Sequence, residues 1–208
     1  MIISHQHRFC YFALPRTGSK AVSKALNDAG YGQMVKPMHR SFTEFMATAT
    51  PAEKGYFTFC TIRNPLDSLV SAYFKKKHDH NGRFSRGTFR NGRPIAEENL
   101  KEYRFIQEND ADFASYFEHF YTTPYTRPRH EETVRRVDRV LRHENLAEDF
   151  KETLDTMGLP DVPLPVYNVT KGKKPEFTAY YPERIRPQAR EVLGQLMKDW
   201  GYAFPEDW

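Results

Sequence analysis

Several features are missing from this sequence of 208 residues. No apolar run approaches the roughly 20 residues of a membrane-spanning helix, and the first residues, MIISHQHRF, lack the apolar core of a secretory signal. There is no internal repeat and no low-complexity segment, which excludes repeat architectures. We therefore expect a cytoplasmic protein whose residues 1–208 form a single domain, because single cores extend to about 250 residues.

Cysteine and net charge are also scarce. The two cysteines, Cys10 and Cys60, lie in apolar runs of strand length, which predicts buried thiols rather than a disulfide or a metal pair. The 31 Lys and Arg residues exceed the 27 Asp and Glu residues by only four. That balance is too weak for a tail-like nucleic-acid binder, but it suits a protein that handles small anions or an acidic polymer.

Two copies of a strand–turn–helix pattern are present. Residues 8–14 (RFCYFAL) form an apolar run, and after a polar turn the apolar residues recur at helical spacing until Gly30. Residues 56–62 (YFTFCTI) form the second run, after which Asn64 can cap a helix and Pro65 fits its first turn. Apolar strands that are each followed by a helix predict an α/β fold with a central parallel sheet flanked by helices.

Shorter signals complete this expectation. Ser41 and Glu44 have the spacing of a capping box that opens a short helix. Residues 137–142 predict a third strand, and the helix after it ends at Gly158. Pro187 should lie in the first turn of the last helix or break that helix in two.

A basic segment of a different kind covers residues 75–93. It holds seven Lys and Arg residues against one acid, Asp79, and three glycines interrupt it. This composition predicts a flexible loop that either attracts an anionic acceptor, gates a site, or is simply solvated.

The turn after the first predicted strand, residues 15–20 (PRTGSK), is typical of an anion site. A loop that leads from a strand into a helix aims backbone N–H groups at one spot, where the helix dipole adds positive charge. The turn offers a glycine for close approach, two hydroxyls and two cations: Gly18, Thr17, Ser19, Arg16 and Lys20. It is not a Walker A loop, because alanine replaces the first glycine and the lysine follows the serine. An ordinary strand-to-helix turn is the alternative interpretation.

The second pattern adds a further cation and hydroxyl. Arg63 stands at the end of the second strand, and Ser71 lies eight residues later in the following helix. The planar guanidinium group of arginine matches phosphate oxygens. Two anion sites on neighbouring strands would suit a nucleotide that is phosphorylated at both ends.

These residues resemble motifs of the sulfotransferases that use 3′-phosphoadenosine-5′-phosphosulfate (PAPS). Residues 15–20 followed by Ala21 look like the 5′-phosphosulfate loop of that family, and residues 63–65 with Ser71 and Tyr73 look like its 3′-phosphate motif. Residues 137–146 resemble a strand and acidic segment of the carbohydrate-type members, and the closing DWGY resembles their terminal helix signature. The motifs occur in family order over nearly the whole chain.

The resemblance implies a P-loop nucleotide-kinase-like sulfotransferase fold without a metal. PAPS would be the donor, adenosine 3′,5′-bisphosphate (PAP) the product, and the sulfuryl group would move by in-line displacement to a hydroxyl or amine. The acceptor implied is a small molecule or a glycan, which can be anionic; neither nucleic acid nor a membrane is an expected partner. The donor-binding residues implied are Arg16, Thr17, Gly18, Ser19, Lys20, Ala21, Arg63 and Ser71.

Two residues of the first turn depart from the family pattern. Arg16 stands where lysine is usual; because arginine is a poor proton donor, we expect it to act by electrostatics alone. Lys20 stands where a small hydroxyl residue is usual. It is either a second cation on the sulfonate or the solvated start of a helix.

The acceptor's proton requires a base. His39 lies where carbohydrate-type members place a catalytic histidine, and an ordinary histidine pKa of about 6.5 suits that role. A capping or surface histidine is the alternative. Glu144 is the second candidate for the base, and the alternative there is a buried structural carboxylate that pairs with Arg142 or Arg16.

Further weak candidates lie elsewhere. The polar loop of residues 168–174 resembles a lysine–glycine loop that closes over the 3′-phosphate, which makes Lys171 and Gly172 donor-binding candidates. The aromatic residues of 113–120 are more simply explained by packing, and residues 78–80 (HDH) lack a third ligand at helical spacing for a metal.

Two other functions stay open at this point. A nucleotide kinase-like phosphotransferase would share the fold but predicts a Walker lysine, which the first turn lacks. A non-catalytic module that binds polyanions or nucleic acid through the basic segment predicts strongly salt-dependent binding and leaves the Arg63–Ser71 arrangement unexplained.

Overall fold

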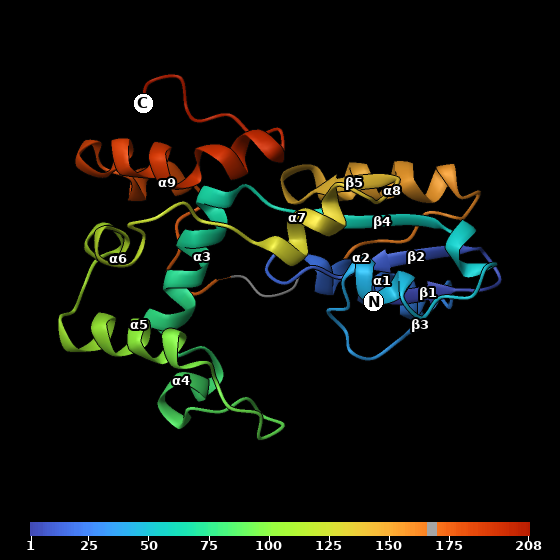
Figure 1. Ribbon diagram of the computed structural model, residues 1–208, viewed down its shortest axis with the longest axis horizontal. Helices are drawn as coiled ribbons and strands as arrows, with labels where there is room; N and C mark the ends of the chain where they lie inside the picture. The colour runs from blue at the N-terminus through green and yellow to red at the C-terminus, as the bar shows by residue number, and fades with distance from the viewer. Residues whose placement is uncertain (166–169) are drawn as a thin grey trace. The chain divides into compact units, whose positions relative to one another are not determined.

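The computed structural model describes residues 1–165 and 170–208, whose contacts form two compact units. The sheet unit consists of residues 1–64 and 127–165, and the helical unit of residues 65–126 and 170–208. Each is described by itself (Figure 1). None of the described helices has both the length and the apolar character needed to cross a membrane. That residues 1–208 act as one functional domain stays a prediction.

The sheet unit is built on five strands in the order β3-β1-β2-β4-β5 (Figure 1). Strands β2, β4 and β5 are parallel neighbours, as the strand–turn–helix patterns predict, and β5 forms one edge of the sheet. The strands are β1 (Ile2–Ser4), β2 (Phe9–Phe12), β3 (Gln33–Met34), β4 (Phe57–Ile62) and β5 (Arg139–Arg142).

The sheet differs from the expectation at its β3 side. Strand β1 runs antiparallel to both β2 and β3, so the sheet is parallel only across β2, β4 and β5. The reason is the connection: four residues, 5–8, join β1 to β2, whereas a parallel pair needs a crossover of a dozen residues or more. The three-residue strand β1 was not predicted from the sequence.

Three of the four helices of the sheet unit follow the sequence signals, whereas the helix Pro128–Val134 was not predicted from the sequence. The capping box forms: the Ser41 hydroxyl accepts the Glu44 amide at 3.3 Å, and the Glu44 carboxylate accepts the Ser41 amide at 2.7 Å. The helices are α1 (Ser19–Asp28), α2 (Phe42–Met46), α7 (Pro128–Val134) and α8 (Leu146–Thr156), with 3-10 turns at Glu53–Gly55 and His143–Asn145.

Both cysteines are buried free thiols, as predicted. They lie on the adjacent central strands β2 and β4, in the apolar interior of the sheet. Burial raises the pKa of the Cys10 thiol to about 12 and raises that of the Cys60 thiol further above its ordinary value.

The helical unit packs five helices and three 3-10 turns around an aromatic core. The helices are α3 (Pro65–Lys77), α4 (Arg83–Arg86), α5 (Glu97–Glu108), α6 (Phe113–Phe120) and α9 (Arg186–Asp199), and the turns are His80–Gly82, Phe177–Tyr180 and Glu183–Ile185. Pro187 lies in the first turn of α9, one of the two positions expected for it.

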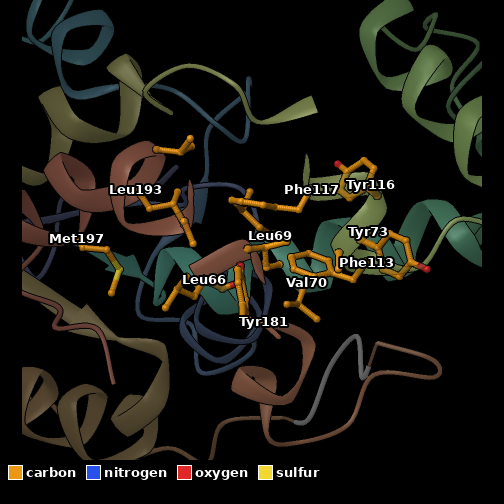
Figure 2. Close-up of a cluster of buried hydrophobic side chains, with 14 of the residues drawn as sticks. Leu66, Leu69, Val70, Tyr73, Phe113, Tyr116, Phe117, Tyr181, Leu193 and Met197 are labelled. Carbon is orange, nitrogen blue, oxygen red and sulfur yellow. The ribbon is translucent and has the colours of Figure 1, made fainter. Parts of the chain in front are cut away.

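Aromatic rings fill the core of the helical unit, as Figure 2 shows. Residues of α6 pack there against α3 and α9, which confirms the packing interpretation of residues 113–120. The buried tyrosines are hydrogen-bonded: the Tyr181 hydroxyl donates to the Leu66 carbonyl at 3.0 Å, and the Tyr73 hydroxyl donates to the Ala111 carbonyl at 2.7 Å. The core is thus apolar in bulk, and these two buried hydroxyls have backbone partners.

The basic segment is not the continuous loop that the glycines suggested. Its three lysines, residues 75–77, extend α3 by a turn, because lysine is a good helix former and cations are favourable at a helix C-terminus. The Asp79 carboxylate then accepts the amides of Phe84 and Ser85 at 2.8 and 3.3 Å and so organises the start of α4. A single bridge joins Thr88 to Pro94.

Candidate functional site

The turn between β2 and α1 has a left-handed backbone. Arg16 has φ of 70° and Gly18, the N-cap of α1, has φ of 81°. No side chain caps α1, and no acidic residue lies in its first turn. The first N–H groups of a helix lack intrahelical acceptors and carry the positive end of the dipole, so this turn can accept an anion.

Gly18 is required by its surroundings as well as by its φ angle. A Cβ atom at this position would lie 2.9 Å from Nδ1 of His143 and 3.1 Å from Cδ2 of Leu146. Those residues follow β5, so the turn packs against the end of a second parallel strand. The glycine therefore lets the turn approach that strand end closely.

A chain of hydrogen-bonded hydroxyls connects the turn between β2 and α1 to the interior of the sheet unit. The buried Thr17 hydroxyl donates to the Leu14 carbonyl at 2.8 Å and lies 2.7 Å from the Thr61 hydroxyl, which lies 2.9 Å from the hydroxyl of Tyr11. Since Thr17 has one proton and the carbonyl takes it, Thr61 must donate to Thr17, and Tyr11 to Thr61. Burial raises the pKa of Tyr11, which keeps its proton in place. The chain fastens the first turn to the end of β4.

This arrangement separates the sequence-predicted residues of the turn. The hydroxyl of Thr17 points into the unit, and the Ala21 amide donates to the Gly18 carbonyl at 2.9 Å, which weakens the expectation that either group contacts a ligand. Ser19 is buried and Arg16 half-buried, whereas Lys20 is exposed. The cations and the left-handed turn thus remain the basis of an anion site.

Arg63 emerges at the same edge of the sheet as this turn. It follows Ile62, the last residue of β4, and β4 is parallel to β2 with Phe12 opposite Cys60. Because parallel neighbours end at one edge, the sheet unit presents the two predicted arginines, Arg16 and Arg63, from adjacent strand ends.

Glu144 fixes the turn that contains Arg63. One of its carboxylate oxygens accepts the Asn64 amide at 2.8 Å. The side chain is exposed, which corrects the alternative of a buried structural carboxylate. Its structural bond to the backbone weakens the case for Glu144 as the base.

His39 lies against the segment that leads from β2 into the first turn. Its Nδ1 atom lies 2.6 Å from the carbonyl oxygen of Ala13, the first residue after β2. A carbonyl can only accept, so Nδ1 carries the proton, and in the neutral ring Nε2 keeps its lone pair. His39 is exposed, so Nε2 can take a proton from a bound molecule.

Two further residues at the turn were missed from the sequence. Arg127 donates through Nη2 to the Pro15 carbonyl at 2.9 Å, and the same nitrogen lies 2.6 Å from Nε2 of His130. Burial, together with the charge of Arg127, lowers the pKa of His130 to about 3, so this ring is neutral and can accept. Their contacts with Pro15 span more than 110 residues of sequence, and no local motif signals them.

The helical unit holds the remaining predicted donor-binding residues. Ser71 of α3 is buried, and its hydroxyl lies 3.0 Å from that of Thr170. Gly172 has φ of 77°, and a Cβ atom there would overlap the His78 ring. Lys171 is exposed and forms no ion pair with any residue in the described part of the chain. Residues 168 and 169 of the predicted loop lie outside the described residues.

Lys173, which the sequence did not single out, anchors that loop. Its Nζ lies 2.7 Å from Asp67 of α3, and both side chains are about one-tenth exposed. Asp67 and Ser71 lie four residues apart on one face of α3, and His78 follows seven residues later, one position past the end of the helix. The segment from Thr170 to Lys173 thus follows one stripe of α3.

The HDH triplet has another use. Asp79 is engaged by the start of α4, as described above, and the described residues contain no group of three or more metal-ligating side chains.

Taken together, the turn, its cations and the parallel strand ends define an α/β protein with a candidate anion site. Comparison with known families identifies it further: the sulfotransferase family matches residues 1–199 of this chain. The chain therefore belongs to the sulfotransferase family, which supports a transferase, and sulfotransfer in general, as its activity. Comparison with curated proteins and with solved structures gives no match.

Proposed function

We propose that this chain is a PAPS-dependent sulfotransferase that acts as one domain and transfers the sulfuryl group to a hydroxyl of a carbohydrate or a similar polar acceptor. The observation that supports this most is the uncapped, left-handed, cation-bearing turn before α1, which leaves the sheet beside the strand end that carries Arg63. Two anion sites at one sheet edge match a donor that is phosphorylated at both ends.

The residues of the first turn fit the 5′ end of the donor. The N-terminus of α1 has no competing cap or acid, and Gly18 gives the close approach that a sulfonate or phosphate needs. Arg16 and Lys20 add positive charge. The donor supplies the sulfuryl group, and its departure leaves negative charge on a phosphate oxygen, which the fixed cations and N–H groups stabilise.

The 3′ end of the donor is assigned by motif. Arg63 and Ser71 are the arginine and serine of the resembling 3′-phosphate motif, and Lys171 with Gly172 is its lysine–glycine loop. In the helical unit, the Ser71–Thr170 contact ties the start of this loop to α3, which supports a role for Ser71, Lys171 and Gly172 in one binding element.

Arg127 positions the first turn in this proposal. By taking the Pro15 carbonyl as acceptor, it holds the peptide that precedes Arg16 and keeps a carbonyl dipole satisfied beside an anion site. The neutral His130 ring in turn accepts from Arg127 and orients its guanidinium group. Arg16 then acts by charge alone.

His39 is the base that the geometry favours. The Ala13 carbonyl fixes the Nδ1–H form, so Nε2 is the atom that takes the acceptor's proton. His39→Ala should lower the turnover about 100-fold or more, with PAP affinity nearly unchanged. A wild-type rate in this variant would assign the base to Glu144 or to solvent.

The direct test is transfer of labelled sulfate from PAPS to a panel of glycans, phenols and alcohols, combined with melting temperatures. PAP should raise the melting temperature more than AMP does, because it contacts both anion sites. Equal stabilisation by AMP would contradict the second site. Magnesium-dependent transfer of phosphate from ATP would instead establish the kinase-like alternative.

A further inference from the structure

We propose that the helical unit carries a binding groove for an uncharged sugar ring. The groove lies between α5 and the segment that follows α6, and it has a volume of about 510 Å3. Its lining combines aromatic rings with carboxylates and one lysine: Phe120, Tyr121, Tyr125, Glu98, Glu102 and Lys101. None of these residues belongs to the motifs assigned to the donor.

One wall of the groove is fixed by a charged network beneath it. Lys76 is 2% exposed and lies 2.8 Å from Oε2 of Glu102. The hydroxyl of Tyr116 donates to the same oxygen and lies 3.2 Å from that of Tyr121. A buried lysine is costly unless it is paired, so this network holds the Glu102 carboxylate in one orientation.

The second carboxylate oxygen of Glu102 is the specific feature. Within residues 1–165 and 170–208, Oε1 accepts no hydrogen bond, although Oε2 forms an ion pair with Lys76 and accepts from the hydroxyl of Tyr116. Because Glu102 lines the groove and its carboxylate is held rigid, Oε1 can serve as an acceptor for a ligand hydroxyl. Binding such a hydroxyl costs little reorganisation, because the network already orients the side chain.

The aromatic side chains supply the complementary surface. Tyr121 and Tyr125 have ring centroids 5.6 Å apart at 61°, so their faces are inclined to each other. Both rings, like that of Phe120, are half-buried and expose part of their surface. The C–H face of a sugar ring is apolar while its edge carries hydroxyls, which matches aromatic walls with a few placed polar groups.

Charge balance selects an uncharged ligand. Glu98 and Glu102 are opposed by Lys101 in the lining and by Lys76 beneath it. An anionic sugar would meet two carboxylates, and a cation would meet Lys101 and a Glu102 carboxylate whose charge Lys76 already balances. The groove thus differs from the cation-bearing turn before α1 and takes a neutral, hydroxyl-bearing ring.

Binding of the sugar stands on the groove alone, whereas its identity as part of the sulfate acceptor rests on the proposed function. The two are tested in one set of samples. Maltotriose, cellotriose and triacetylchitotriose serve as neutral probes, and phenol and a glucuronate disaccharide test whether an aromatic or an anionic ligand binds instead. Saturation-transfer NMR and calorimetry measure binding. PAP binding is measured in parallel.

At least one neutral trisaccharide should bind, and Tyr125→Ala should weaken it at least tenfold, whereas Tyr31→Ala, a half-buried tyrosine of the sheet unit, should leave it unchanged. Glu102→Gln should also weaken binding; because this change leaves Lys76 without its carboxylate, circular dichroism must show that the variant is folded, and Tyr125→Ala remains the deciding variant. Unchanged affinity in Tyr125→Ala would contradict the proposed sugar site. Binding of phenol or glucuronate in place of every neutral sugar would contradict it as well. Sugar binding without PAP binding would support the groove and overturn the proposed function.

Discussion

The two units hold their functional side chains in different ways. In the sheet unit, individual hydrogen bonds to the backbone position them. Thr17, His39 and Arg127 bond to the carbonyl groups of Leu14, Ala13 and Pro15, and Glu144 bonds to the amide of Asn64. In the helical unit, Ser71 and Asp67 lie on α3, whose other faces are buried among aromatic rings. Backbone tethers fix a turn atom by atom, whereas apolar burial fixes a whole helix.

This difference has a consequence for substitutions. A turn held by a few directional bonds should lose its geometry, and with it activity, when one bond is removed. A helix held by a large apolar area should tolerate the loss of one polar contact on its surface. Changes in the sheet unit are therefore expected to have larger effects than changes in the helical unit.

The largest effect is expected for Arg16→Ala. Loss of a fixed cation at the leaving group should lower sulfate transfer about 100- to 1000-fold, the range seen when one such donor is removed. The melting temperature should change little, because Arg16 is only half-buried. Arg139→Ala is the matched control, since Arg139 pairs with Glu152 at the start of β5. A rate loss of similar size in the control would contradict the role of Arg16.

Next is Gly18→Ala, measured by urea unfolding. Both Gly18 and Gly30 have left-handed φ angles, so alanine should cost about 1–2 kcal/mol of unfolding free energy at either position. Only Gly18 also faces His143 at 2.9 Å, and nothing lies within 4 Å of the Gly30 position. Gly18→Ala should cost roughly 1–3 kcal/mol more than Gly30→Ala. Equal losses would show that the contact with His143 is easily relieved.

The pH dependence of stability tests the half-buried His130. Its pKa is lowered from 6.5 to about 3 in the folded chain, mainly by burial. Between these values the unfolded chain binds a proton that the folded chain does not, so unfolding free energy falls as the pH drops below about 6.5. His130→Gln should flatten this decline between pH 7 and pH 5 in urea titrations. Parallel pH profiles for the variant and the wild type would refute the assignment.

The smallest effect is expected in the helical unit. A double-mutant cycle with Asp67→Asn and Lys173→Met should give a coupling of about 1 kcal/mol in unfolding free energy, since the pair is largely buried but α3 keeps its apolar contacts. If the single variants unfold the protein, the helix depends on this ion pair, and the contrast between the units fails.

The sequence predicted the parts of the fold that local physics decides. The apolar runs of β2 and β4, the capping box at Ser41 and the helix that begins at Pro65 each depend on neighbours within a few residues. The basic segment was misjudged because its glycines suggested a loop, although three lysines in succession continue a helix.

The site was predictable to a similar extent. Arg16 and Gly18 stand out by composition, but a motif does not show that the Thr17 hydroxyl points inward or that Glu144 binds a backbone amide. Arg127 reaches Pro15 from 112 positions away, so only tertiary packing brings it to the turn. Tethers between distant segments are what sequence patterns leave out.

The two buried thiols have a practical use. A thiol reacts as thiolate, and at neutral pH neither Cys10 nor Cys60 provides it while the interior of the sheet stays closed. Alkylating reagents should therefore modify this chain only as often as the central strands open. The rate of alkylation of these native cysteines thus reports how often the sheet opens, with no engineered label.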